Sequence, residues 1–182
     1  MVLAWYTALS LRRPWSTAFV TCTAKGCASD LIVQVAVEGH SEVDLWRNTV
    51  FAFYGGWYCG CFQHGVYNVL YGRLFGSDTG IGTALRKVVF DSAFHVPFVV
   101  YPVYYSYKAV LYDGQTASDG LRRYGGEWQE MCQNYYSVWV PANLLVFTIV
   151  PEPLRVAFIA TTSFVWLGAV SFLTHRREAE KH

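Results

Sequence analysis

The chain has 182 residues, enough for one domain with a substantial buried core. It is 53% hydrophobic, 18% aromatic and 15% charged, whereas an ordinary globular chain is about 25% charged. A net charge of +1, with no cluster of Lys and Arg interleaved with aromatic residues, argues against a nucleic-acid partner. These proportions favour a membrane protein.

The first apolar stretch covers residues 14–37 and is predicted to be a membrane span. It begins with Pro14, which suits the first turn of a helix. Asp30, Gln34 and Glu38 follow one another at four-residue spacing, so they share one side of a helix. With Lys25 as well, this is the least lipid-like of the predicted spans.

The second predicted span covers residues 48–71, between two arginines that can reach lipid headgroups. Gly56 and Gly60 form a GxxxG pair, which lets another helix approach closely. His64 and Asn68 continue the same four-residue column. The sequence leaves two interpretations open for them: hydrogen bonds to a neighbouring helix, or the lining of a polar path.

The third predicted span covers residues 88–112. It contains Asp91, His95 and Lys108, together with two prolines, so its polar groups must be covered by other helices. Lys87 precedes Asp91 by four residues. An ion pair near one membrane face and a role in transport are both compatible with that spacing.

The fourth predicted span covers residues 154–173; its 20 residues match a hydrocarbon layer of ~30 Å. Arg155 is its only charged residue. Residues 131–151 are also free of charge, and they fit a fifth span or a shorter, broken segment packed against the bundle.

Charge placement favours four spans. Four spans put eight Lys and Arg residues on one side and three on the other, as the positive-inside rule expects. The eight are Arg12, Arg13, Arg73, Arg86, Lys87, Arg176, Arg177 and Lys181. The predicted fold class is therefore all-α: a polytopic four-span helical bundle forming a single membrane-embedded domain over residues 1–182, with an additional amphipathic, interfacial or re-entrant helix at about 128–150.

Neither a metal site nor a catalytic site is predicted. The five cysteines form no CxxC pair, and on a helix Cys59 and Cys61 point to nearly opposite sides. No nucleophile accompanies the histidines. Haem ligation by His64 and His95 has no supporting pattern, so no cofactor is predicted.

Spaced residues along nearly the whole chain carry a resemblance to a known family. The opening "WYTALSLRRPWST", the Asp44 and Arg47 before the second span, and the later "WVPANLLVFTIVPEPLR" each match part of a pattern. The chain resembles the Mpv-seventeen family, which includes the twenty-two-kilodalton peroxisomal membrane protein. In the two quoted stretches the matching positions are Trp5, Leu9, Pro14, Thr17, Trp139, Phe147, Val150, Pro151 and Arg155. Elsewhere they are Asp30, Gln34, Gly60, His64, Tyr67, Leu70, Lys87, Asp91, Pro97 and Trp166.

The chain also departs from the family's pattern. Ser92 stands where glutamine is usual, Asn143 replaces glutamine, and Val146 replaces asparagine. Pro141 comes one residue later than the usual proline. The changes shorten or remove amide side chains, and the change at Val146 removes a donor and an acceptor outright. A pore that depends on those groups would be weakened, whereas a packing role would survive.

The resemblance implies a four-span protein of the mitochondrial inner membrane, or alternatively of the peroxisomal membrane. Some family members are regarded as weakly selective channels for small solutes. Because of the departures, we expect a non-catalytic structural or accessory subunit of a larger mitochondrial membrane complex. The alternative is a weakly selective small-solute channel. The expected partners are membrane lipids and other inner-membrane protein subunits.

Two sets of site residues follow from these patterns. The residues expected to pack helices together are Gly56, Gly60, Trp139, Pro141 and Trp166. The residues expected in a polar interior or pore are Asp30, Gln34, His64, Asn68, Lys87, Asp91, His95, Asn143 and Arg155.

Overall fold

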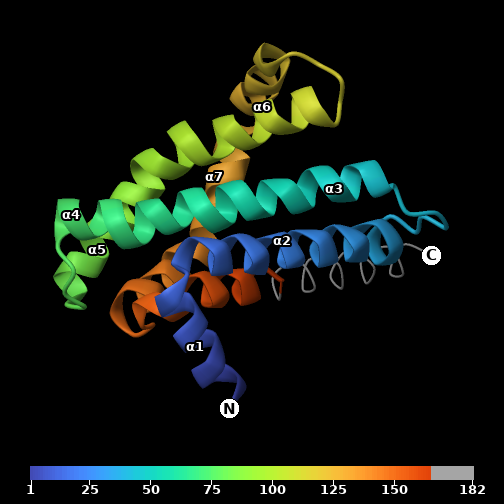
Figure 1. Ribbon diagram of the computed structural model, residues 1–182. Helices are drawn as coiled ribbons and strands as arrows, with labels where there is room; N and C mark the ends of the chain where they lie inside the picture. The colour runs from blue at the N-terminus through green and yellow to red at the C-terminus, as the bar shows by residue number, and fades with distance from the viewer. Residues whose placement is uncertain (165–182) are drawn as a thin grey trace, which may run out of the picture. The chain divides into compact units, whose positions relative to one another are not determined.

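The computed structural model describes residues 1–164, and every regular element in that part of the chain is a helix (Figure 1). The prediction of an all-α protein is confirmed. The chain divides into two compact units, one formed by Met1–Val69 together with the segment from Pro151 onward, the other by Leu70–Val150.

The first unit is built on two long helices. The elements before the break are α1 (Val2–Arg12), α2 (Pro14–Ile32), η1 (Val33–Val37), α3 (Leu45–Tyr54), η2 (Gly55–Phe62) and η3 (Gly65–Leu70), the last of which ends in the second unit. After Pro151 come η5 (Glu152–Leu154) and a helix that is described as far as residue 164. The segments η1, η2 and η3 are π-helical, with more residues in each turn than the 3.6 of an α-helix.

Glycines allow α2 to lie directly against η2, and the two run side by side in Figure 1. A Cβ atom built on Gly60 would lie 2.6 Å from the Ala18 carbonyl oxygen. One on Gly55 would overlap the Cys22 carbonyl. Only glycine leaves room for backbone at this distance, so these positions fix how closely the two helices pack.

The second unit contains α4 (Tyr71–Phe75), α5 (Ile81–Phe90), η4 (Asp91–Val100), α6 (Tyr101–Leu111) and α7 (Ala117–Thr148). The helix from Ile81 to Leu111 is unbroken and has a π-helical centre at η4. It starts earlier than the predicted span at 88–112. The stretch predicted at 128–150 belongs to the 32-residue helix α7, which starts at Ala117 because Thr116 and Asp119 form a capping box.

One helix in the described part of the chain is long and apolar enough to cross a membrane by length and composition, and it is Pro14–Val37. Only 22% of its most apolar stretch is buried within the chain, whereas a core helix of a soluble protein would be mostly buried. Its bounds coincide with the first predicted span. The four-span arrangement stays a prediction, and residues 165–173 of its last span, with Trp166, lie outside the described residues.

Candidate functional site

The structure gathers the predicted polar residues into three groups. Two lie in the first unit: the Asp30 cluster, made of Asp30, Gln34, Glu38, Asp44, Arg47 and Asn48, and the His64 pocket, around His64, Asn68 and Arg155. The third, the Asp91 cluster, lies in the second unit and is made of Tyr71, Asp91, His95, Tyr135 and Asn143. Each is described by itself.

Asp30 is the centre of the first cluster and is only 6% exposed. Its Oδ1 accepts a bond of 2.9 Å from Arg47 Nε, and its Oδ2 accepts one of 2.7 Å from Gln34 Nε2. Asn48 Nδ2 also donates to Oδ2, at 3.2 Å. A buried carboxylate is tolerated only when it is paired and hydrogen-bonded, and these three side chains satisfy that requirement.

The same cluster joins the end of one helix to the start of the next. Gln34 Oε1 accepts a bond of 2.7 Å from the Asp44 backbone amide, just before α3. Arg47 donates from both terminal nitrogens to the two oxygens of Glu38, at 2.6 and 3.0 Å. This two-point contact with a carboxylate fixes the guanidinium in place. The Asp30 cluster therefore acts as a clamp across the connection between η1 and α3.

We predict a pH dependence for this clamp. The hydrogen bond from Arg47, and then its charge, hold the pKa of the Glu38 carboxyl below its ordinary value of 4.5. Because the folded-state pKa is lowered, the contribution to stability is present above pH ~4.5 and is lost as the pH falls through the folded-state value. The Glu38→Gln variant should unfold at a lower temperature than the parent at neutral pH, and the difference should shrink in acid. Since Glu38 is one-third exposed, we expect under ~1 kcal/mol. A difference that grew in acid would contradict this assignment.

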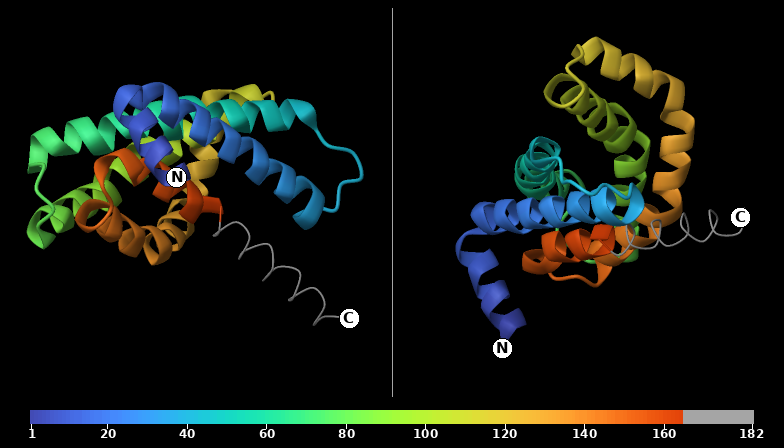
Figure 2. Two further views of the ribbon diagram at one scale, coloured as in Figure 1. Left: turned by 60° about the horizontal axis from the view of Figure 1, so that its bottom comes forward. Right: turned by 90° about the vertical axis from the view of Figure 1, so that its right-hand side faces the viewer.

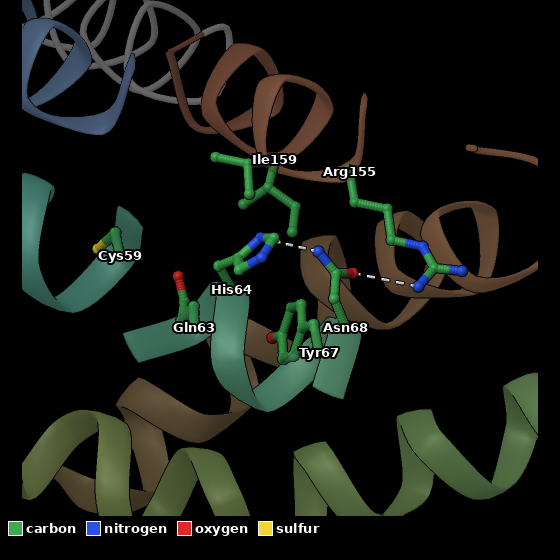
Figure 3. A pocket seen from close by; sticks show the side chains of 8 residues that line it. Cys59, Gln63, His64, Tyr67, Asn68, Arg155 and Ile159 are labelled. Atoms are coloured by element: carbon green, nitrogen blue, oxygen red, sulfur yellow. Dashed lines mark hydrogen bonds between the residues drawn. The ribbon is translucent and has the colours of Figure 1, made fainter. Parts of the chain in front are cut away.

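The His64 pocket has a row of hydrogen bonds along one wall (Figure 3). Asn68 Nδ2 donates to His64 Nδ1 at 2.9 Å, and Arg155 Nη1 donates to Asn68 Oδ1 at 3.2 Å. Because Nδ1 accepts, a neutral His64 ring carries its proton on Nε2. The Trp15 ring contacts the imidazole edge-on, with 5.0 Å between centroids.

The rest of the pocket is mostly apolar. Cys59, Gln63, Tyr67, Val156 and Ile159 complete the lining, and the space has room for about one water molecule. Figure 3 shows the His64, Asn68 and Arg155 side chains in one row, drawn from two segments far apart in the sequence. The arrangement can hold a water or a small polar group beside a guanidinium that is 8% exposed.

Asp91 is fully buried and is surrounded by donors in the second unit. The Tyr71 hydroxyl donates to Oδ1 at 2.8 Å, and His95 Nδ1 lies 2.8 Å from the same oxygen. The Tyr135 hydroxyl and Asn143 Nδ2 donate to Oδ2, at 2.9 and 3.1 Å. Both oxygens of the carboxylate therefore accept bonds from α4, η4 and α7 together.

Two further groups lie beside this cluster. Lys87, four residues before Asp91, is 1% exposed, and its Nζ lies 5.4 Å from the centre of the Phe147 ring. A cation over an aromatic face is attracted by the ring's electrons. Asn143 Nδ2 also donates to the Tyr135 hydroxyl at 3.2 Å, so the donors around Asp91 are bonded to one another as well.

Two tyrosine hydroxyls of α7 donate hydrogen bonds to backbone carbonyls in the proline-containing part of the neighbouring helix. In a π-helix an N–H bonds the carbonyl five residues earlier, and proline has no N–H. Pro97 thus leaves the Ser92 carbonyl without that donor, and the Tyr136 hydroxyl donates to it at 3.0 Å. The Pro97 carbonyl, one turn before Pro102, accepts a bond of 2.8 Å from the Tyr124 hydroxyl.

We predict that these two hydroxyls stabilise the proline-containing segment. Tyr124→Phe and Tyr136→Phe should each cost about 1 kcal/mol and should speed amide hydrogen exchange in residues 92–101. Tyr101→Phe is the matched control, because its hydroxyl donates to the Met131 carbonyl on α7 and not to a carbonyl that proline has freed. Faster exchange at residues 92–101 in the control alone would contradict the prediction.

Comparison with known proteins supports the family resemblance seen in the sequence. Residues 110–171 match the model of the Mpv17 / PMP22 family. Protein sym-1 of Neurospora crassa is 27% identical over 94% of this chain and 98% of its own length. The chain is therefore similar to the Mpv17 / PMP22 family over most of its length.

Two further relatives align over nearly the whole chain. The mitochondrial inner membrane protein Mpv17 of Danio rerio is 21% identical over 94% of this chain and 96% of its own length. Protein SYM1 of Debaryomyces hansenii is 24% identical over 95% and 89% respectively. No solved structure matches.

The structure places the predicted packing residues in different surroundings. Gly56 and Gly60 lie against α2 of the same chain, near Phe19 and Ala18. Trp139 stacks on Tyr135, with ring centroids 5.9 Å apart. Pro141 is exposed on α7.

Sequence reasoning missed several residues of the three groups. Arg47 was expected at a lipid headgroup, yet it is bonded to Asp30 and Glu38. Tyr71 and Tyr135 were not singled out, because tyrosine is common in membrane proteins and neither stands near Asp91 in sequence. A useful signal would have been the need of a buried carboxylate for several donors, which polar aromatic residues can supply.

The described part of the chain, residues 1–164, contains no group of three or more His, Cys, Asp and Glu residues placed to hold a metal ion. Its five cysteines are free thiols. The contacts that the structure shows at the three groups are hydrogen bonds and ion pairs, one of them bidentate, and the His64 pocket has room for about one water molecule.

Proposed function

We propose that this protein is a member of the Mpv17 / PMP22 family. We further propose that it is a non-catalytic integral protein of the mitochondrial inner membrane and a structural or accessory subunit of a larger membrane complex. The location is supported by the Danio rerio relative, which is named as a mitochondrial inner membrane protein. A membrane position is also supported by Pro14–Val37, which is long and apolar enough to span.

The Asp91 cluster is the main observation that supports a structural role for the protein. Ionisable residues within membrane spans are functional candidates by default. Here the carboxylate, on η4, accepts bonds from α4 and α7 and so ties the three segments together. Interhelical polar contacts of this kind are a common way of stabilising a membrane bundle.

The proposal includes four spans, at about 14–37, 48–71, 88–112 and 154–173. Single cysteines at Ser41 and Ser77, in a variant whose five native cysteines are replaced, test this arrangement. Both positions lie in exposed loops, and four spans put them on opposite sides of the membrane. A membrane-impermeant maleimide should label one in intact vesicles and the other only after permeabilisation. Labelling of both from the same side would contradict the arrangement.

Extraction in mild detergent followed by native gel separation tests the accessory role. We expect the protein to migrate well above its monomer mass of 20.6 kDa, after correction for detergent, with other inner-membrane proteins in the same band. Migration only as a free monomer, from extracts that preserve known complexes, would contradict it.

The second candidate is a weakly selective channel for small solutes, and the His64 pocket favours it. That pocket places a buried guanidinium, an amide and an imidazole beside a water-sized space. Purified protein in planar bilayers should then conduct, and Arg155→Gln, which removes the charge that lines the pocket, should change its selectivity. Repeated silent recordings with protein shown to be folded would count against a channel.

A further inference from the structure

The outward face of α1 is apolar, although it is the exposed side of the helix. Trp5 is 65% exposed and Leu11 is 67% exposed. The exposed positions of the helix and its N-cap are Met1, Val2, Leu3, Ala4, Trp5, Ala8, Leu11 and Arg12. Most of them recur at the three- and four-residue spacing that marks one side of a helix.

Two uncharged polar residues of α1, Tyr6 and Ser10, lie on its other side, against the rest of the first unit. The Tyr6 hydroxyl bonds the Thr21 hydroxyl of α2 at 3.0 Å, and Ser10 is buried. An ordinary surface helix has the opposite distribution, with its apolar side packed inward. The distribution in α1 means that its outward side suits an apolar environment better than water.

The position of α1 agrees with a membrane surface. Its last residue is Arg12, the backbone turns at Arg13, and α2 begins at Pro14 as the candidate span. Figures 1 and 2 show α1 turning away from the direction of α2. If α2 crosses the bilayer, the junction at Arg13 lies where the hydrocarbon meets the headgroups. Trp5 and Trp15 on either side of it are of the type enriched at that depth.

Charge indicates which headgroups fit. Arg12 and Arg13 are exposed at the end of the apolar face, and the chain has no Asp or Glu before Asp30. In space, Glu152 of η5 lines a pocket with Tyr6 and Ser10, the residues on the inner side of α1. An apolar helix face that ends in two exposed cationic residues is typical of helices that lie in the interface of an anionic membrane.

We propose that α1 lies in the membrane interface, with its Trp5–Leu11 face among the acyl chains and with Arg12 and Arg13 on anionic lipid headgroups. This inference rests on the proposed membrane location and adds to it a lipid class and the residues that recognise it. Headgroups bound at Arg12 and Arg13 would hold the junction between α1 and α2 at a fixed depth.

A fluorophore on the outward face tests the inference in the full chain. Ala8 is replaced by cysteine in the variant without native cysteines, labelled with an environment-sensitive dye, and reconstituted in phosphatidylcholine vesicles with or without phosphatidylglycerol. Lipids carrying a nitroxide on the acyl chain should quench the Ala8 dye, and more strongly when phosphatidylglycerol is present. A dye at Ser41, in an exposed loop, is the matched control and should be quenched weakly in both.

Arg12→Gln with Arg13→Gln gives the decisive comparison. At roughly 1 kcal/mol for each arginine near an anionic surface, the ratio of docked to undocked α1 should fall about thirtyfold in phosphatidylglycerol vesicles. It should change little in phosphatidylcholine alone. Equal quenching in the two lipids with no effect of the arginines would overturn the recognition of anionic headgroups.

Two other results would also overturn the inference. One is an Ala8 dye that no acyl-chain nitroxide quenches although the protein floats with the vesicles. The other is an Ala8→Cys variant that forms a disulfide between two copies, which would make this face an interface of the chain with itself. Failure of the folded protein to float with any vesicle would instead contradict the proposed membrane location.

Discussion

Replacing Asp91 with alanine should lower the free energy of unfolding of the second unit by about 3–5 kcal/mol, the range found when one partner of a buried charged contact is removed. The substitution leaves four polar groups, on Tyr71, His95, Tyr135 and Asn143, without their shared acceptor. Each buried group that loses its bond costs about 1–3 kcal/mol. The measurement is thermal or denaturant unfolding in detergent.

Variants of the partners show whether Asp91 is the centre. Tyr135→Phe removes one donor and leaves the other three in place, so it should cost only about 0.6 kcal/mol, the average for an interhelical hydrogen bond in a membrane. Glu130→Gln changes an exposed carboxyl on the same helix and should stay within about 0.5 kcal/mol of the parent. Equal losses for Asp91→Ala and Glu130→Gln would contradict the assigned role.

Local sequence patterns predicted the helices but not the residues that each helix contacts. Apolar length placed a helix at each predicted span, and the bounds of the first agree with the structure. The observed and predicted helix ends differ where a capping residue sets the start of the helix. Thr116 caps α7, which begins eleven residues before the predicted segment at 128. Asp91 meets Tyr135 and Asn143, 44 and 52 residues away, and no local period signals such contacts.

The residues at every fourth position of the second predicted span also show that a local pattern does not identify contact partners. Gly56, Gly60, His64 and Asn68 were predicted to share one side of a helix. In the structure the glycines contact α2, while Asn68 bonds Arg155 after Pro151. Each step of four turns an α-helix about 40° past a full circle, and the π-helical turns of η2 and η3 alter that drift. One column can therefore serve two neighbours, which only the packed structure reveals.

Substitutions at the contact between α2 and η2 are the second group from which we expect a large loss of stability. In Gly55→Ala and Gly60→Ala the new methyl groups would meet the carbonyls of Cys22 and Ala18, which belong to backbone and cannot turn aside. Overpacking of this kind costs about 1–3 kcal/mol at each site, while alanine's greater helix propensity returns at most about 1 kcal/mol. We expect each variant to be destabilised and the double variant to lose about 2 kcal/mol or more.

Gly126→Ala is the matched control, because nothing lies within 4 Å of the position that its Cβ would take on α7. At this position alanine's greater helix propensity is not offset by overpacking. The variant should therefore be as stable as the parent or up to about 1 kcal/mol more stable. The opposite signs separate a close helix–helix contact from a general effect of replacing glycine. If Gly60→Ala stabilised the protein as Gly126→Ala does, α2 and η2 could not approach each other as closely as these contacts require.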